Sequence, residues 1–165
     1  MVKTPMEHVA ITEADKTDIP VLLTMIRELA EFEQLQHELA VTEASLCDAI
    51  FGERPAASAL LAHVDNEPAG YAVYYRTFST FVGRPGVFLD DVYVRPAYRA
   101  RGLGQALLER AARSGDGFGR YEWIALRWNE NALRFYRNLG ATLLHDWVFV
   151  RMSGEPLRRL MEVNS

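Results

Sequence analysis

Apolar residues recur with the period of an α-helix in four parts of the chain. The clearest stripe consists of Val21, Leu22, Met25, Ile26, Leu29 and Phe32. Residues 44–50, 103–113 and 129–139 have the same period. Thr42, with Ser45 three residues later, suits the start of the second helix, and Gly140 suits the end of the fourth. The pattern therefore predicts four helices.

Runs of β-branched and aromatic residues between glycines, prolines and polar turns predict the strands. These runs cover residues 8–12, 58–65, 70–78, 87–94, 121–127, 141–144 and 147–152. The turn at 66–70 favours an antiparallel hairpin between residues 58–65 and 70–78. The order of elements predicts an α/β or α+β fold in which helices flank a mixed, mostly antiparallel central sheet. We expect residues 1–165 to form a single domain.

The composition fits a globular protein with a substantial core, since 49% of the 165 residues are hydrophobic and 24% are charged. A formal net charge of -4 argues against nucleic acid as a partner. Cys47 is the sole cysteine, so no intrachain disulfide can form. The sequence has no signal-peptide pattern and no apolar run of membrane-spanning length. We therefore expect a cytoplasmic protein that does not insert into a membrane.

The segment from Arg99 to Gly104 lies between a predicted strand and a predicted helix. It carries two arginines and two glycines where backbone N–H groups begin a helix, which is typical of an anion site. The alternative is a tight turn without a ligand. The segment lacks the Gly-Lys-Ser/Thr of nucleotide hydrolases and the three-glycine spacing of dinucleotide sites. Residues 127–132 form a second strand-to-helix junction.

These segments together carry a resemblance. Arg99-x-x-Gly102-x-Gly104 after LDDVYV, followed by WNENALRFYRNLGA, is similar to the motifs of the GNAT superfamily of N-acetyltransferases. RELAEFE, FSTFVGRPG and DWVFVR resemble more narrowly the diamine branch, which comprises spermidine/spermine and thialysine acetyltransferases. The resemblance covers most of the chain. It implies transfer of an acetyl group from acetyl-coenzyme A (acetyl-CoA) to a small amine, by a protein that is commonly a homodimer.

The resemblance also implies a cofactor site. The pyrophosphate would lie on backbone N–H groups of residues 101–105, and the pantetheine arm would pair with the end of the strand at 92–94. The implied set is Val92, Tyr93, Val94, Arg99, Ala100, Arg101, Gly102, Leu103, Gly104, Gln105, Asn129, Asn131, Ala132 and Tyr136. Ala100 departs from the glycine that is commoner at its position. For Asn129 and Asn131, helix capping is an alternative role.

Two residues are implied as catalytic. Tyr136 matches the tyrosine that protonates the departing thiolate, although helical spacing alone would make it a core aromatic. Asp90 lies where the diamine branch has a glutamate that accepts the proton of the amine. Because aspartate is one methylene shorter, a water relay is favoured over direct proton abstraction. Alternation along a strand would turn Asp90 and Asp91 to opposite faces.

The candidate substrate-binding residues are acidic or aromatic. They are Phe32, Glu33, Asp90, Asp91, Glu122 and Asp146. For Glu33 the alternative is a solvated acidic helix face, and for Asp91 it is burial against another element. Ser79 and Phe81 replace the acid and the tryptophan that polyamine-specific members often carry, so this loop is closer to the thialysine type.

Three functions remain in competition. We favour acetylation of a small diamine, polyamine or lysine-like amine by direct transfer in a ternary complex, because Cys47 lies in a separate helical segment. The alternatives are acetylation of protein N-termini or protein lysines, and a non-catalytic module that binds acyl-CoA. The four histidines have no metal-binding spacing, so no metal is expected.

Overall fold

The computed structural model describes residues 8–162, and the chain divides after Ile124 into two compact units. The first unit contains β1 (Val9–Glu13), α1 (Ile19–Glu33), α2 (Glu43–Phe51), β2 (Ser58–Val64), β3 (Glu67–Ser79), β4 (Arg84–Val94), α3 (Leu103–Ala112) and β5 (Arg120–Trp123). Short 3₁₀ turns lie at Lys16–Asp18 (η1), Gln36–Glu38 (η2) and Pro96–Tyr98 (η3). The second unit contains α4 (Glu130–Asn138) and α5 (Gly154–Glu162).

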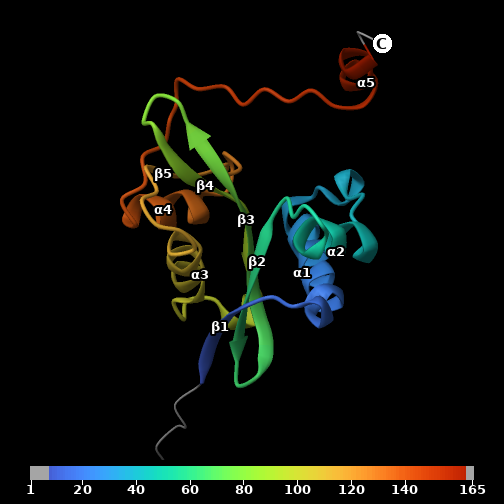
Figure 1. The fold of residues 1–165 in the computed structure, drawn as a ribbon. Helices are drawn as coiled ribbons and strands as arrows, with labels where there is room; N and C mark the ends of the chain where they lie inside the picture. Colours follow the sequence, from blue (N-terminus) through green and yellow to red (C-terminus); the bar gives the residue numbers. More distant parts are fainter. Residues whose placement is uncertain (1–7, 163–165) are drawn as a thin grey trace, which may run out of the picture. The chain divides into compact units, whose positions relative to one another are not determined.

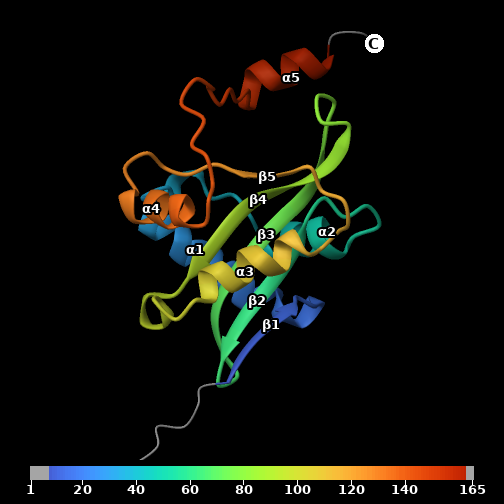
Figure 2. The same ribbon diagram turned by 90° about the vertical axis from the view of Figure 1, so that its left-hand side faces the viewer.

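The first unit is built on one mixed sheet with the strand order β1-β2-β3-β4-β5. Neighbouring strands from β1 to β4 are antiparallel, and β5 is parallel to β4. Helices α1 and α2 cover one face of this sheet, and α3 covers the other (Figures 1 and 2). The predicted mixed, mostly antiparallel sheet with flanking helices is confirmed.

The main core lies between the sheet and the pair α1 and α2. Its buried members are Ile19, Leu22, Leu23, Met25, Ile26, Leu46, Ile50, Ala59, Leu61, Tyr71, Val73 and Tyr93. The helical residues in this set come from the predicted apolar stripes of α1 and α2. The core therefore fixes α1 on the same face of the sheet as Tyr71 and Tyr93.

Local signals place the helix ends. Thr42 and Ser45 form a reciprocal capping box at the start of α2, as predicted. Pro20 lies in the first turn of α1, while the carboxylate of Asp18 accepts from the Asp15 N–H and does not cap the helix. α1 ends because Gln34 adopts a left-handed conformation with φ of 60°.

A β-bulge interrupts β4 at Asp90. Val73 of β3 lies opposite Asp91, but the next residue, Tyr74, lies opposite Leu89, so Asp90 is an extra residue. The bulge changes which β4 side chains face α1. Leu89 shares a face with Tyr74, whereas Asp91 shares a face with Val73. The strict alternation assumed in the sequence prediction therefore fails at this point.

The predicted strand at 121–127 is shorter than expected. β5 ends at Trp123, which pairs with Leu89 at the edge of the bulge. The ladder stops there because a bulge disrupts the regular pairing of the neighbouring strand.

The predicted strands at 141–144 and 147–152 are wrong. Both segments are irregular, and the side chains from Trp147 to Val150 are exposed. A strand needs backbone partners, and the described part of the second unit contains no strand that could supply them. Helix α5 was not predicted, although Leu157, Leu160 and Met161 have helical spacing. Among residues 8–162, no helix has the length and apolar character needed to cross a membrane.

Candidate active site

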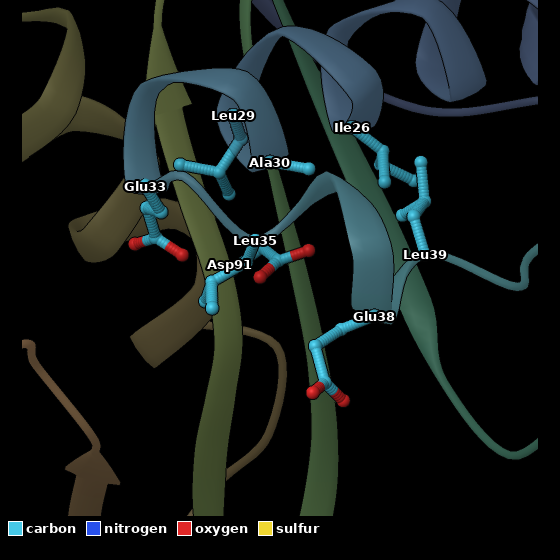
Figure 3. Close-up of a pocket in the computed structure, with 8 residues that line it drawn as sticks. All are labelled: Ile26, Leu29, Ala30, Glu33, Leu35, Glu38, Leu39 and Asp91. Atoms are coloured by element: carbon cyan, nitrogen blue, oxygen red, sulfur yellow. The ribbon is translucent and has the colours of Figure 1, made fainter.

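A small open pocket lies where the last turn of α1 and η2 approach β4. Its volume is about 160 Å³. Its lining consists of Ile26, Leu29, Ala30, Glu33, Leu35, Glu38, Leu39 and Asp91. Figure 3 shows the carboxylates of Glu33 and Asp91 directed into the same space, whereas that of Glu38 lies apart. The pocket thus combines apolar walls with carboxylates.

Asp91 is the most perturbed carboxyl group of this pocket. The hydroxyl of Tyr71 donates a hydrogen bond to Oδ2 of Asp91 at 3.2 Å. Burial raises the pKa of Asp91 to about 6, the charges of Asp90 and Glu33 raise it as well, and the Tyr71 hydrogen bond opposes them. Asp91 is therefore mainly ionised at neutral pH, in surroundings that disfavour its negative charge.

Glu33 adds a second carboxylate at the end of α1. Burial raises its pKa above the ordinary value for glutamate. The carboxyl end of a helix also carries a partial negative charge. A cation in the pocket would relieve the repulsion among these groups, so the electrostatics favour a positively charged ligand.

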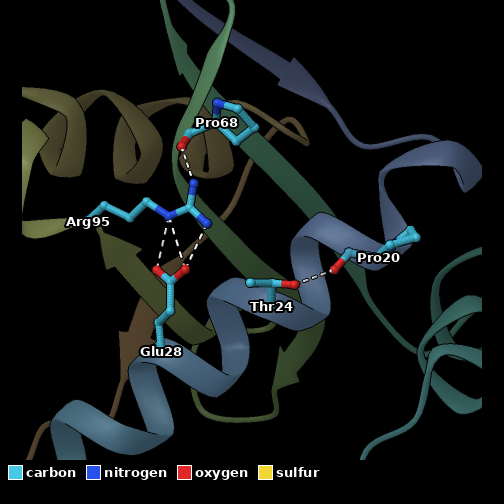
Figure 4. A network of polar contacts seen from close by, with 5 residues as sticks. All are labelled: Pro20, Thr24, Glu28, Pro68 and Arg95. Carbon is cyan, nitrogen blue, oxygen red and sulfur yellow. Dashed lines mark hydrogen bonds and ion pairs between the residues drawn. The ribbon is translucent and has the colours of Figure 1, made fainter.

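Glu28, one turn earlier in α1, does not line the pocket because Arg95 holds it. The Arg95 guanidinium donates to both carboxylate oxygens, from Nε to Oε2 at 3.0 Å and from Nη2 to Oε1 at 2.7 Å. Its Nη1 also donates to the carbonyl of Pro68 at 2.8 Å. Figure 4 shows this network, which connects α1 to the start of β3 and to the end of β4. Glu28 is therefore neutralised by a cation of the protein itself.

One edge of β4 is open next to this pocket. Within the described part of the first unit, β5 pairs with β4 only from Gly86 to Leu89. The Arg95 N–H donates to Ala69 of β3 at 2.9 Å. Because alternate residues of a strand direct their backbone groups to the same side, Val92 and Val94 direct theirs to the open edge. The expected pairing of an extended ligand with Val92 and Val94 fits this geometry.

The carbonyl of Val94 is already used at this edge. It accepts a hydrogen bond from Nε of Arg99 at 2.9 Å. The guanidinium of Arg99 also lies over two rings, at 5.1 Å from the centroid of Phe32 and 5.8 Å from that of Tyr93. Arg99 therefore connects the residues after β4 to the last turn of α1.

The predicted anion site has the backbone form expected of it. Gly102 occupies the N-cap of α3 with φ of 79°, and no side chain caps this end. The N–H groups of the first turn thus have no carbonyl partner within the helix. Ala100 has φ of 61°, a left-handed value that favours glycine, which explains why glycine is commoner there. Arg101 donates to the carbonyl of Ala97 at 3.1 Å. The turn therefore fits a pyrophosphate through its backbone.

The second unit contains the other expected site residues. The side chain of Asn129 accepts from the N–H of Ala132 at 3.2 Å and caps α4. Oδ1 of Asn131 accepts from Arg134 at 3.2 Å. Tyr136 is a buried residue of α4, with Phe135 beside it. Asp146 lies in an exposed turn of the same unit.

The structure brings together only some of the predicted substrate-binding residues. Glu33 and Asp91 share the pocket, and Asp90 acts on Asp91 through its charge. Phe32 is 41% exposed and carries the Arg99 guanidinium. Glu122 lies on β5, where it faces Arg120 at 3.8 Å and does not line the pocket.

Sequence reasoning missed Tyr71 and the η2 segment. Tyr71 lies two residues before Val73, the partner of Asp91, so strand alternation could have placed it on the same face. The η2 segment gave no comparable signal, because the residues after α1 have no regular apolar period.

The sequence is similar to a known family and to known proteins. The family described as Acetyltransferase (GNAT) family matches residues 23–141, which span most of the first unit and all of α4. The thialysine N-epsilon-acetyltransferase of Mus musculus is 36% identical over 168 residues, covering 94% of this chain and 98% of the mouse protein. The L-ornithine N5-acetyltransferase of Arabidopsis thaliana is 26% identical, covering 92% of this chain and 87% of the plant protein.

Solved structures share the fold. The aminoglycoside N-acetyltransferase AAC(6')-Iy, crystallised with CoA, has a TM-score of 0.71 at 19% sequence identity. The comparison covers 92% of this chain and 99% of that one. At this level of identity the likeness concerns the arrangement of the elements alone.

Proposed function

Because the chain belongs to the acetyltransferase (GNAT) family, we propose that it acetylates the terminal amine of a small cationic substrate. The chain is an N-acyltransferase, and acetyl-CoA is the acetyl donor of this family. The observation that carries the proposal is the pair of carboxylates, Glu33 and Asp91, in a pocket beside the open edge of β4. Together these features match a cationic acceptor and an extended acyl carrier.

A lysine-like substrate is favoured over a long polyamine. The names of the mouse and plant relatives each specify a side-chain nitrogen of an amino acid. The pocket of about 160 Å³ suits a short chain, and its apolar walls suit the methylene groups of such a substrate. In addition, Glu28 is occupied by Arg95, so it is not available to a third cationic group.

In this proposal, separate residues of the chain bind the cofactor, orient the amine and transfer the protons. The first turn of α3 would bind the pyrophosphate, and Val92 would donate its N–H to the thioester carbonyl oxygen. Acetyl-CoA supplies the activated acetyl group. Asp91 would orient the reacting ammonium, Glu33 would attract a second positive charge of the substrate, and Asp90 would accept the proton of the ammonium through water. Tyr136 would protonate the departing thiolate.

The transfer is proposed to be direct, without an acetylated cysteine. Cys47 belongs to α2, packs against the core cluster and does not line the pocket. Cys47→Ala should therefore retain acetyl transfer. Loss of transfer in a folded variant that still binds acetyl-CoA would contradict the direct mechanism.

We also propose that the protein is a homodimer. The exposed apolar residues of the second unit, from Trp147 at 77% to Val150 at 84%, support a partner of the same kind. Replacing Trp147 and Phe149 by serine should shift the mass measured by light scattering towards that of a monomer.

The proposed compartment is the cytoplasm. The lone, partly buried Cys47 suits such a reducing compartment.

The proposed function is tested by measuring CoA release with a panel of acceptors. The panel contains thialysine, lysine, ornithine, putrescine, spermidine and a lysine-containing peptide, each with acetyl-CoA. We expect the highest kcat/KM for a short amine with a second polar end. Activity on the peptide with none on the free amines would establish a protein acetyltransferase instead.

A further inference from the structure

We propose that Tyr71 is a positioning residue, whose hydroxyl keeps the carboxylate of Asp91 directed into the pocket as the acceptor for the substrate ammonium. This inference rests on the proposed function, and it concerns a residue of β3 that does not line the pocket.

The geometry of Tyr71 is fixed by its surroundings. Its side chain is 0% exposed and belongs to the core cluster beneath α1. Its ring lies 6.2 Å from that of Tyr93, its cross-strand partner, at an interplanar angle of 50°. A ring held in this way has little freedom, so its hydroxyl marks a fixed point next to Asp91.

The hydroxyl satisfies one oxygen of Asp91 and leaves the other for a ligand. The bond runs from Tyr71 Oη to Asp91 Oδ2 at 3.2 Å. Asp91 lies diagonally across from Tyr71 on the β3–β4 ladder, opposite Val73. A carboxylate accepts at both oxygens, so Oδ1 keeps its capacity to bind an ammonium.

The charged groups around Asp91 are mainly acidic. They are Asp90 from β4, Glu33 from α1 and, at the pocket wall, Glu38 from η2. Burial and the charges of Asp90 and Glu33 disfavour the ionised form of Asp91, and the Tyr71 hydrogen bond opposes this effect. Tyr71 remains a donor throughout the physiological range, because burial and the charges of Asp91, Glu33 and Asp90 raise the pKa of Tyr71 well above 10.

The hydroxyl is not needed to fill space. Phenylalanine would occupy the same core volume, whereas a buried hydroxyl requires a hydrogen-bonding partner. Tyr71→Phe therefore removes the contact with Asp91 and leaves the packing in place.

The test is the pH dependence of kcat/KM for the best amine of the panel. Tyr71→Phe should move the midpoint of the acidic limb to higher pH. It should also raise the KM for the amine at neutral pH by about three- to tenfold, the loss typical of one hydrogen bond, and leave the KM for acetyl-CoA unchanged. The matched control is Tyr74→Phe, which removes a hydroxyl from a tyrosine that is 5% exposed on the opposite face of β3.

An acidic limb that stays in place, or that moves equally in both variants, would overturn the inference. Asp91→Asn provides a second check, because Tyr71→Phe should not raise the amine KM further in that background. A further rise of the same size would show that Tyr71 acts independently of Asp91. If the wild-type enzyme releases no CoA with any amine, the proposed function itself fails. An active wild type with an unshifted Tyr71→Phe profile refutes only the role of Tyr71.

Discussion

Arg95 donates hydrogen bonds to both carboxylate oxygens of Glu28 and thereby connects α1, which lines the pocket, to the end of β4. The two contacts measure 3.0 and 2.7 Å, and the side chains of Arg95 and Glu28 are 27% and 31% exposed. This paired geometry is the strong form of the arginine–carboxylate interaction. Its position at the junction of α1 and β4 makes it a structural support of the pocket.

Arg95→Ala should lower the free energy of unfolding by about 2 kcal/mol, since it removes charged hydrogen bonds in a partly buried place. Denaturant unfolding measures the change. Arg110→Ala is the matched control. It breaks the contact of Arg110 with Glu13 at 2.9 Å, and Glu13 is 70% exposed, so the loss should stay below about 1 kcal/mol. If both variants lost the same free energy of unfolding, the Arg95–Glu28 pair would stabilise the protein no more than an exposed ion pair does.

Asp91→Asn should stabilise the protein in a pH-dependent way. Folding raises the pKa of Asp91 from 3.8 to about 6. The buried carboxyl group therefore costs no stability below about pH 4, where it is protonated in both the folded and the unfolded chain. As the pH rises through 6, the free energy of unfolding falls, because the folded state resists ionisation of this group. At pH 7.5 the variant should gain up to about 3 kcal/mol, and at pH 4 it should gain little. Unfolding at both pH values measures this. A gain that does not depend on pH would contradict the shifted pKa.

Glu33→Gln should discriminate between substrates by their charge. We expect the KM of a diamine to rise roughly tenfold and that of a monoamine much less, since the lost attraction acts mainly on a second positive charge. Glu122→Gln is the control, because Glu122 does not line the pocket. Equal effects on the two substrate classes would remove Glu33 from the substrate site.

Ala100→Gly should relieve backbone strain in the anion-binding turn. The left-handed conformation at φ of 61° costs a residue with a Cβ about 1–2 kcal/mol, and the greater freedom of glycine in the unfolded chain offsets about half of this. The net gain should be about 0.5–1 kcal/mol by thermal unfolding. Ala106→Gly, inside α3, should instead lose about 1 kcal/mol.

Tyr136→Phe should lower kcat by about a hundredfold or more, as expected for loss of a general acid. The affinity for CoA, measured by calorimetry, should change little. Phenylalanine keeps the packing of this buried ring, so the variant should fold. If affinity and turnover fall together, Tyr136 is a binding residue and not the acid.

The sequence predicted best those features that local signals control. The apolar stripe of α1, the Thr42–Ser45 box and the hairpin of β2 and β3 all follow from the order of neighbouring residues. The strand, turn and helix around Gly102 were predicted in the same way. Glu33 and Asp91 were singled out individually, yet their convergence depends on how α1 packs on the sheet.

Other features depend on partners distant in sequence. The segments 141–144 and 147–152 have strand-like composition, but composition cannot supply the neighbouring backbone that a strand requires. The hold of Arg95 on Glu28 joins residues 67 positions apart. The residues next to Glu28 or Arg95 in the sequence do not indicate that these two side chains pair.

The extra residue in β4 has a consequence for how this enzyme can change. A strand has two faces, and a single insertion or deletion in a regular stretch exchanges them for every residue beyond it, whereas removal of a bulge residue does not. Deleting Asp90 would remove more than one carboxylate. It would also remove the bulge and restore regular pairing, with Leu89 still opposite Tyr74 and Asp91 still opposite Val73, so both side chains would keep their present faces. The faces of β4 therefore do not depend on keeping a residue at position 90, whereas a deletion at a paired position of the strand would exchange them.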